Sequence, residues 1–309
     1  MTAQPLALIS LPGNDAQTTL LVRALGGADI AAEQVGATVR RFPDAESYVR
    51  VDASVKGGDV ALVCTLDRPD DKILPLLFLA ATLRDLGARR VGLIAPYLAY
   101  MRQDRQFVPG EGVTSKYFAT LLSASVDWLV TVDPHLHRHS ALSQIYNIPT
   151  RVVHAATRMA DWIRHNTRRP VLIGPDEESS QWVAAVAEAA DAPWIALRKE
   201  RHGDRDVSVS TPDIDRWVNH TPVLVDDIIS TARTMIETVR HLQQVALPAP
   251  VCVGVHGVFA PGAFNDLRAA GAGRIVTCNT IPHVSNTIDL SADLAQAIVY
   301  TLQSAPATN

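Results

Sequence analysis

The 309-residue sequence predicts an α/β protein made of two doubly wound domains with mainly parallel sheets. Short runs of aliphatic residues alternate along the chain with stretches of helical periodicity, a pattern typical of β-α-β units. We expect about a dozen strands, more than one compact sheet usually holds. The length also suits two domains of ~150 residues each. We therefore expect one domain at residues 1–149 and a second at residues 150–309, with the boundary near Pro149.

In the first half, aliphatic and β-branched runs predict the strands, and apolar residues at helical spacing predict the helices. The expected strands are residues 6–11, 38–43, 48–51, 59–65, 90–97 and 128–133. The expected helices are residues 18–25, 73–86 and 115–122. Gly87 follows the second helix and is a residue type suited to a helix end.

The second half repeats this rhythm. The expected strands are residues 151–154, 171–176, 194–197, 223–225, 251–256 and 274–278, and the expected helices are residues 155–165, 181–190, 234–242, 263–270 and 291–302. Strands in both halves are followed by acids, namely Asp133, Asp176, Asp226 and Asp227. Ligands of such sheets gather beyond the carboxyl ends of the strands, so these acids are candidate site residues.

The composition is that of a globular protein with a sizeable core, with 47% hydrophobic and 19% charged residues. The net charge is −4 and no basic block occurs, so we expect no nucleic acid partner. Cys64, Cys252 and Cys278 lie far apart in apolar runs, which indicates core residues in a reducing compartment. No signal peptide and no apolar run of ~20 residues occur, so we expect a cytoplasmic protein without a membrane partner.

The strongest single motif is the stretch at residues 223–235. Three aliphatic residues lead into Asp226 and Asp227, and a hydroxyl-rich turn with Ser230 and Thr231 precedes a helical pattern. Backbone N–H groups at a helix start, with hydroxyls beside them, suit a phosphate dianion. Paired carboxylates at a strand end suit sugar hydroxyls or hydrated Mg²⁺. An ordinary turn between strand and helix is the competing interpretation.

Two stretches of the first half suit a nucleotide. Arg102 and Arg105 follow a strand, where cations are apt for polyphosphate, although a solvated basic loop has the same composition. In the turn at residues 41–46, Phe42 can stack on a base while Asp44 and Glu46 accept hydrogen bonds from an exocyclic amine. A plain β-turn with Pro-Asp explains that segment equally well.

Two further stretches carry possible catalytic groups. Three histidines alternate at residues 135–139, and we expect a loop there in which His135, next to the strand end, lies near a phosphate or a metal. The stretch at residues 197–206 is rich in charge and contains Gly203. A mobile loop of this kind can close over a transferring phosphoryl group, whereas most charged hairpins are solvated turns. Neither a P-loop nor a dinucleotide glycine motif occurs.

Taken together, these stretches resemble the ribose-phosphate diphosphokinases, also called phosphoribosyl diphosphate (PRPP) synthetases. Eight motifs occur in the order of that family, at residues 13–14, 42–46, 96–104, 133–135, 174–176, 199–201, 225–231 and 279–283. The forms Arg-Phe-Pro-Asp at 41–44 and Phe-Val-Pro-Gly-Glu-Gly at 107–112 look more like its archaeal branch. The resemblance implies two domains of the type I phosphoribosyltransferase fold, with the ATP side at 1–149, the ribose 5-phosphate side at 150–309 and the active site between them.

The implied reaction moves the β,γ-diphosphoryl group of Mg·ATP to the 1-hydroxyl of ribose 5-phosphate, which gives PRPP and AMP. The implied partners are these two substrates and further copies of the chain in a dimer or hexamer, and Mg²⁺ is the implied cofactor. The resemblance assigns ATP binding to Phe42, Asp44, Glu46, Arg102 and Gln103, with the adenine contacts coming from a neighbouring subunit. It assigns Mg²⁺ to His135 and Asp176, catalysis to Lys199 and Arg201, and ribose 5-phosphate to Asp226, Asp227, Ser230, Thr231, Ala232, Arg233 and Thr234.

The sequence departs from the family pattern at two of these places. Residues 177–180 are Glu-Glu-Ser-Ser where the family usually has glycines, and residues 231–234 are Thr-Ala-Arg-Thr in place of Thr-Gly-Gly-Thr. If the backbone at Ala232 or Arg233 takes a positive φ, these residues tolerate it poorly. Two alternatives stay open: a non-catalytic, regulatory relative that binds synthetase subunits, and a phosphoribosyltransferase that consumes PRPP.

Overall fold

The computed structural model describes residues 4–136, 138–174, 180–201, 207–210, 214–245 and 247–304; for residues 180–181, 198–201, 207–210 and 214–215 it describes the backbone alone. The chain divides into two compact units. The first unit comprises Met1–Val153 and Ser291–Asn309, and the second comprises His154–Leu290. This division differs from the expected halves in falling after Val153 and in assigning the last helix to the first unit.

The first unit is built on a six-stranded sheet in which every neighbouring pair of strands is parallel. The order is β2-β1-β5-β6-β7-β8. The strands are β1 (Leu6–Ser10), β2 (Ala32–Gln34), β5 (Asp59–Val63), β6 (Arg90–Ala95), β7 (Trp128–Val132) and β8 (Thr150–Val153). The central strands β5, β6 and β7 are almost wholly buried, which explains their continuous aliphatic sequences.

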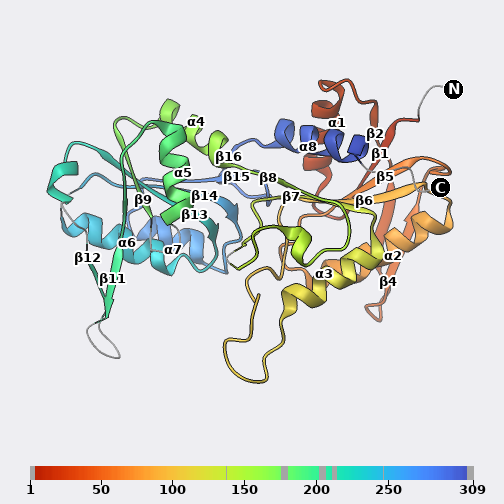
Figure 1. The fold of residues 1–309 in the computed structure, drawn as a ribbon, viewed down its shortest axis with the longest axis horizontal. Coiled ribbons are helices and arrows are strands. Elements are labelled where there is room, and N and C mark those ends of the chain that lie inside the picture. Colours follow the sequence, from red (N-terminus) through yellow and green to blue (C-terminus); the bar gives the residue numbers. More distant parts are fainter. Residues whose placement is uncertain are drawn as a thin grey trace. The chain divides into compact units, whose positions relative to one another are not determined.

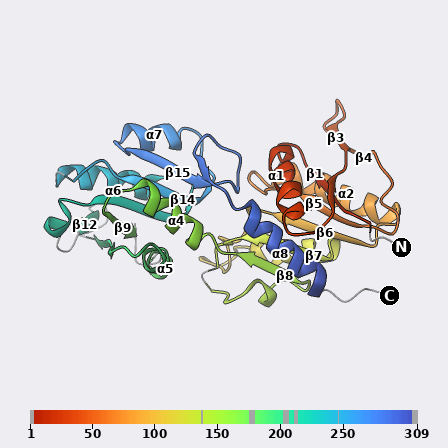
Figure 2. The same ribbon diagram turned by 90° about the horizontal axis from the view of Figure 1, so that it is seen from above.

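Helices cover both faces of this sheet (Figure 1). Helices α1 (Asp15–Gly26) and α8 (Ser291–Ser304) lie on one face, and α2 (Asp70–Asp85) and α3 (Thr114–Ser125) lie on the other. A short helix, η1 (Leu142–Gln144), precedes β8. The strands β3 (Ala37–Arg41) and β4 (Ser47–Val51) form a separate antiparallel hairpin that packs on α2 and projects from the unit (Figure 2).

The second unit contains the same kind of sheet, again with parallel neighbours throughout. The order is β10-β9-β13-β14-β15-β16. The strands are β9 (Pro170–Gly174), β10 (Trp194–Ala196), β13 (Thr221–Ile229), β14 (Val251–Gly257), β15 (Arg274–Cys278) and β16 (Asn286–Ile288).

Helices α4 (Ala156–Asn166) and α5 (Ser180–Ala190) cover one face of the second sheet, and α6 (Arg233–Gln244) and α7 (Ala263–Ala269) cover the other (Figure 1). The strands β11 (Arg198–Arg201) and β12 (Val207–Ser210) form an antiparallel hairpin outside the sheet, and η2 (Ile214–Trp217) follows. The prediction of two doubly wound, mainly parallel α/β sheets is therefore confirmed.

Several boundaries differ from those expected from the sequence. Strand β13 continues through the two aspartates to Ile229, because Ile228 and Ile229 pair with β14. The three-residue strands β2 and β16 and the hairpin β11–β12 were not expected as separate elements. The expected strands at residues 38–43 and 48–51 form the hairpin β3–β4 and not part of the parallel sheet. No helix in the described part of the chain combines the length and apolarity that a membrane crossing requires.

Candidate functional site

In the second unit, the predicted acceptor residues lie where the sheet changes direction. From β9 the chain runs outward to β10, and after the hairpin it returns to β13 on the other side of β9. The helices that follow β9 and β13 lie on opposite faces of the sheet (Figure 1). The carboxyl ends of such diverging strands leave a crevice in which doubly wound proteins bind ligands. The strand order therefore indicates a ligand site at the carboxyl ends of β9 and β13.

The acid dyad lies near the carboxyl end of strand β13. Asp226 and Asp227 are both half-buried in β13, and the backbone N–H of Asp227 donates to Oδ1 of Asp226 over 3.0 Å. Asp226 pairs in register with Gly254 of β14. A Cβ at Gly254 would come within 2.7 Å of Ile229, so the absence of a side chain allows the strands to approach closely. The dyad thus belongs to rigid strand backbone.

The turn after β13 brings the start of α6 to this edge. Ala232 precedes the helix with φ 57° and ψ 8°, in the left-handed region, and it is buried. This is the conformation that the sequence analysis considered costly for Ala232. Its carbonyl accepts from the N–H of Ile236 over 2.8 Å, which closes the first turn of the helix. The N–H groups at the start of a helix have no partner within the helix, so this turn can donate to an anion.

The loop after β14 supports the turn from behind. The N–H of Phe259 donates to the carbonyl of Ile229 over 2.9 Å, and that of Ala260 donates to the carbonyl of Ser230 over 3.0 Å. Phe259 has φ 38°, and its ring lies 4.5 Å from that of His283. A Cβ at Gly257 would come within 2.6 Å of this phenyl ring. The packing around Phe259 therefore fixes the backbone of Ser230.

The ring of His283 is fixed in this support through its Nδ1 atom. The backbone N–H of Ser285 donates to its Nδ1 over 3.2 Å, and burial lowers the pKa of His283 from its ordinary value. The Ser285 hydroxyl also lies 2.8 Å from Nδ1. Because Nδ1 accepts, the proton of the neutral ring resides on Nε2. The predicted motif at residues 279–283 included this histidine without a role.

The predicted catalytic residues lie in the hairpin β11–β12. Lys199 pairs in register with Val209, and Arg201 pairs with Val207. The charged stretch that was predicted as a loop thus begins as a strand, while residues 202–206 and the side chains of Lys199 and Arg201 lie outside the described part. The predicted metal residue Asp176, together with the unusual residues 177–179, also lies outside the described residues.

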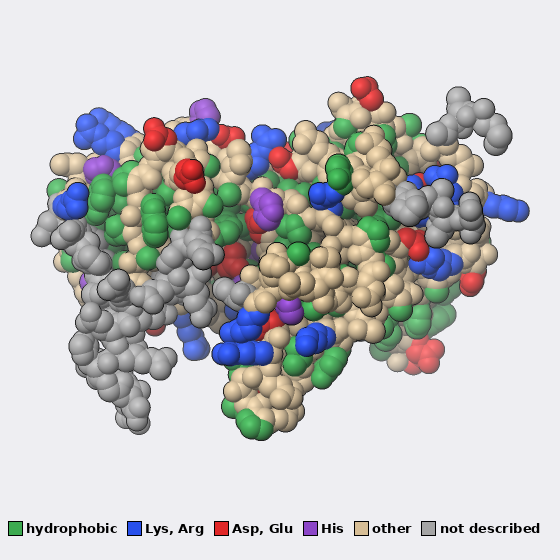
Figure 3. All heavy atoms as spheres, in the orientation of Figure 1, with side chains coloured by type: hydrophobic (Ala, Val, Ile, Leu, Met, Phe, Trp, Pro, Cys, Tyr) green, Lys and Arg blue, Asp and Glu red, His purple; other side chains and the backbone are tan. Residues whose placement is uncertain are grey.

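In the first unit, the predicted phosphate-binding residues follow β6. Arg102 is exposed and Gln103 is half-buried, and the Gln103 carbonyl accepts from the N–H of Ser115 in α3 over 3.3 Å. Figure 3 shows Lys and Arg side chains gathered at the base of the segment that projects there. Two arginines come together here, because the guanidiniums of Arg105 and Arg138 lie 4.9 and 5.7 Å from the ring of Phe107, and the exposed Arg102 stands three residues before Arg105. These arginines offer a cationic surface at the carboxyl edge of the sheet.

Arg138 is one of these arginines, and the sequence analysis did not identify it. Its Nη1 lies 2.7 Å from Oδ1 of the buried Asp104, and this ion pair joins the loop after β6 to the loop after β7. The guanidinium of Arg105 lies 4.9 Å from the ring of Phe107. Arg138 stands within the histidine run at 135–139, and alternating histidines indicate metal binding instead of a cationic surface.

His135 is half-buried in the loop after β7, as expected. Asp133 opens that loop with φ 28°, a strained value for a residue other than glycine, and its N–H donates to the carbonyl of Val153 over 3.0 Å. Within the described residues, no group of three or more His, Cys, Asp or Glu side chains is arranged to hold a metal ion. Asp133 places a half-buried carboxylate two residues before His135.

The three predicted adenine residues share one exposed turn at the tip of the hairpin β3–β4. The N–H of Phe42 donates to the carbonyl of Glu46, and the N–H of Glu46 donates to Oδ1 of Asp44. Phe42 is 40% exposed, and its ring contacts Tyr48 and the guanidinium of Arg40. The turn is closed by these hydrogen bonds and leaves Phe42 partly exposed, on a separate element from the loops after β6 and β7.

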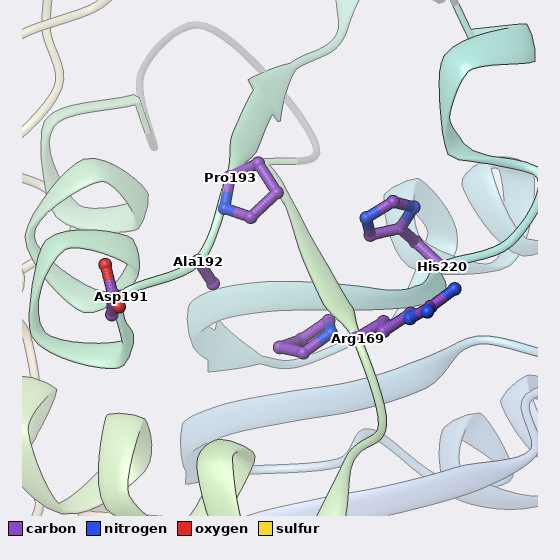
Figure 4. Close-up of a pocket in the computed structure, with 6 residues that line it drawn as sticks. Arg169, Asp191, Ala192, Pro193 and His220 are labelled. Atoms are coloured by element: carbon purple, nitrogen blue, oxygen red, sulfur yellow. The ribbon is translucent and has the colours of Figure 1, made fainter.

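A pocket of about 300 Å³ in the second unit lies away from these residues (Figure 4). It is lined by residues at the start of β9, β10 and β13 or just before it, namely Arg169, Pro170, Asp191, Ala192, Pro193 and His220. The pocket therefore lies at the amino ends of the strands, opposite the edge that carries Asp226. None of the predicted site residues contributes to it.

Comparison with protein families agrees with this architecture. Residues 18–125 match the N-terminal domain of ribose phosphate pyrophosphokinase, and residues 141–293 match the phosphoribosyl transferase domain. A ribose-phosphate pyrophosphokinase of Saccharolobus solfataricus is 35% identical over 266 residues, which cover 84% of this chain and 89% of that protein. The corresponding protein of Methanopyrus kandleri is 31% identical, with 87% of this chain and 92% of that protein covered. These archaeal relatives confirm the expected resemblance.

A crystal structure of phosphoribosylpyrophosphate synthetase from Mycobacterium smegmatis has the same fold. It superposes with a TM-score of 0.84 over 98% of this chain and 100% of that chain, at 22% sequence identity. The match extends over both units, so the fold prediction is supported along the whole chain.

Proposed function

Because the chain belongs to the ribose-phosphate pyrophosphokinase family, we propose that it transfers the β,γ-diphosphoryl group of ATP to ribose 5-phosphate. In this reaction the 1-hydroxyl oxygen of the sugar attacks the β-phosphorus of ATP. The bond between that phosphorus and the oxygen bridging the α- and β-phosphates breaks, and the hydroxyl proton is released. The products are PRPP and AMP.

The observation that carries the proposal is the β13–α6 turn beside the acid dyad. Half-buried Asp226 and Asp227 can accept hydrogen bonds from sugar hydroxyls, and the start of α6 can donate to the 5-phosphate. Ser230, Thr231 and Thr234 add hydroxyl donors, Arg233 adds an exposed cation, and Ala232 sets the direction of the turn. Rigid support from the loop after β14 keeps these groups in place, which orients the attacking hydroxyl.

We assign the nucleotide to residues of the first unit. Arg102 and Gln103 bind the ATP phosphates, and Arg105 and Arg138 add positive charge nearby. Phe42 stacks on the adenine, and Asp44 and Glu46 accept from its amino group. Because these three residues lie at the tip of a projecting hairpin, they are suited to reach a neighbouring subunit in a homodimer or homohexamer. The proposal includes a cytoplasmic location.

Lys199 and Arg201 stabilise the negative charge that spreads over the transferring group in the transition state. When bound, Mg²⁺ would neutralise charge on the ATP phosphates. Mg²⁺ prefers oxygen ligands and keeps several waters, so one or two carboxylates beside a substrate phosphate are enough. The half-buried carboxylate of Asp133 fits that requirement, and Asp176 is a second carboxylate of the same chemistry. His135 lies between these two residues in the sequence and is the third candidate ligand. These three residues would hold the ion.

The proposal is tested by steady-state kinetics with Mg·ATP and ribose 5-phosphate. Lys199→Ala is expected to lower kcat by ~10²–10³-fold with little change in either KM, because its charge is needed mainly in the transition state. Lys56→Ala is the matched control, since Lys56 is exposed in the loop before β5, at the amino edge of the first unit's sheet. A wild type that forms no AMP above the Lys199→Ala background would contradict the proposed function.

Asp226→Ala tests the acceptor site separately. It is expected to raise the KM for ribose 5-phosphate by about tenfold or more while leaving the KM for ATP within twofold, because a hydrogen bond to a charged acceptor is lost. Asp191→Asn, at the amino edge of the same sheet, is the control, because asparagine tolerates the φ of 50° at this position. Equal KM values in Asp226→Ala and in the wild type would refute the assigned role.

A further inference from the structure

The two units repeat one topology, strand for strand. The first sheet has the order β2-β1-β5-β6-β7-β8, and the second has β10-β9-β13-β14-β15-β16. In each unit an antiparallel hairpin, β3–β4 or β11–β12, follows the second strand of the sheet and precedes the third. Each element that carries the proposed acceptor site therefore has a counterpart in the first unit. Strand β5 corresponds to β13, β1 corresponds to β9, and the two hairpins correspond to each other.

The turn after β5 has the same backbone feature as the turn after β13. Arg68 has φ 49° and stands two residues before α2, and Ala232 has φ 57° and stands immediately before α6. The ends of β1 and β5 are joined by the buried side chain of Asn14. Its Oδ1 accepts from the N–H of Thr65 over 2.8 Å, and its Nδ2 donates to the carbonyl of Leu11 over 3.2 Å. The strands β1 and β5 thus diverge in the first unit as β9 and β13 do in the second.

A pocket of about 290 Å³ lies between the loop after β1, the hairpin strand β3 and the start of α2. We call it the β1–α2 pocket; it is lined by Leu11, Pro12, Val39, Arg40, Arg41, Asp71, Lys72 and Pro75. Four of these side chains are apolar, three are cationic and one is acidic. The hairpin supplies Arg40 and Arg41, as the corresponding hairpin of the second unit supplies Lys199 and Arg201.

The three cations of the pocket are held in place by neighbouring groups. The Lys72 ammonium donates to the carbonyl of Thr65 over 2.9 Å and pairs with Asp67, which anchors it beside the turn after β5. Arg41 pairs with Asp71 over 2.7 Å, and both side chains are more than half exposed, so the guanidinium can also turn to a ligand. The guanidinium of Arg40 lies over the rings of Phe42 and Tyr48.

We propose that the β1–α2 pocket binds a small phosphate ester, beside the start of α2, the counterpart of helix α6 in the acceptor site of the second unit. The cationic side chains contact the phosphate, and the apolar side chains contact the body of the ligand. A volume near the lower limit of ~300 Å³ for ligand pockets admits a sugar phosphate and excludes a nucleoside triphosphate. None of the residues assigned to ATP or ribose 5-phosphate lines this pocket. The comparison with the acceptor site rests on the proposed function, whereas the pocket itself does not.

Binding of ribose 5-phosphate, used as the probe without ATP, tests this proposal by equilibrium dialysis with labelled sugar. The full chain is compared with Arg41→Leu, which removes a pocket cation, and with Val39→Phe, which fills the apolar side. Arg23→Leu is the matched control because Arg23 lies in the last turn of α1, outside the pocket. Thermal unfolding of each variant shows that it is folded, and Val39→Phe provides an independent measure if the release of Asp71 disturbs Arg41→Leu.

Arg41→Leu and Val39→Phe are each expected to lose one bound sugar phosphate per chain, or to bind it about tenfold more weakly, while Arg23→Leu binds as the wild type does. Asp226→Ala distinguishes the two sites, since it affects only the acceptor site. If the acceptor assignment fails, Asp226→Ala changes nothing while Arg41→Leu still loses its site. Stoichiometry and affinity in both pocket variants equal to those of the wild type would overturn the proposal.

Discussion

Asn14 is expected to be one of the most sensitive positions of the first unit. Its side chain is 1% exposed and makes three hydrogen bonds, one from the N–H of Thr65 at 2.8 Å and two to the carbonyls of Leu11 and Pro12 at 3.2 and 3.3 Å. In Asn14→Ala, the N–H of Thr65 loses its acceptor in a buried position. A buried donor without a partner costs ~1–3 kcal/mol. Loss of the two further hydrogen bonds and the vacated volume bring the expected destabilisation to about 3 kcal/mol.

The assay is thermal unfolding of the whole chain, followed by circular dichroism, together with hydrogen exchange of the segment around Thr65. For a unit of this size, a loss of about 3 kcal/mol lowers Tm by roughly 6–12 °C. Faster amide exchange at residues 59–66 would locate the change at the junction of β1 and β5. The control is Asn147→Ala, which removes an exposed asparagine of the same unit and is expected to shift Tm by less than about 2 °C. An Asn14→Ala protein with the Tm of this control would refute the reasoning.

Two other predictions concern charge and backbone conformation. Burial raises the pKa of Asp59, but hydrogen bonds from Arg89 and Arg90 lower it more, to about 2 from 3.8. The stability from this depressed pKa is present above pH 3.8 and is lost as the pH falls through about 2. The free energy of urea unfolding of Asp59→Asn should therefore depend less on pH between pH 4 and 2 than that of the wild type. The same pH dependence in both proteins would contradict the ion pair. Ala232→Val places a β-branched residue at φ 57° and should destabilise the start of α6 by about 2 kcal/mol. It should also raise the KM for ribose 5-phosphate more than the KM for ATP. Wild-type KM values for both substrates would show that the turn does not contact the sugar phosphate.

The two sheets could be predicted because their signal is local. Parallel strands that are buried on both faces have continuous aliphatic sequences, and helices with one buried face alternate with them. The backbone strain at Ala232 could also be predicted from the sequence, because Thr-Ala-Arg-Thr stands at a turn where glycine is better suited to a positive φ.

Other features depend on contacts between distant residues. Strand β13 extends beyond Val225 because Ile228 and Ile229 pair with β14, although aspartates are usually depleted in strands. Helix α8 follows the second unit in sequence but packs against α1 of the first. The ion pair of Arg138 with Asp104 joins residues of two loops that are 34 positions apart in the sequence, and no local sequence pattern predicts such a pair.

The identity of the transferred group tests the central claim most directly. Phosphorus NMR of the full chain with Mg·ATP and ribose 5-phosphate distinguishes transfer of a diphosphoryl group from transfer of a single phosphoryl group. We expect AMP and PRPP in equal amounts, with a diphosphate ester at the sugar 1-position and no ADP. Formation of ADP with a singly phosphorylated 1-position, or loss of ATP without any sugar diphosphate, would contradict the central claim.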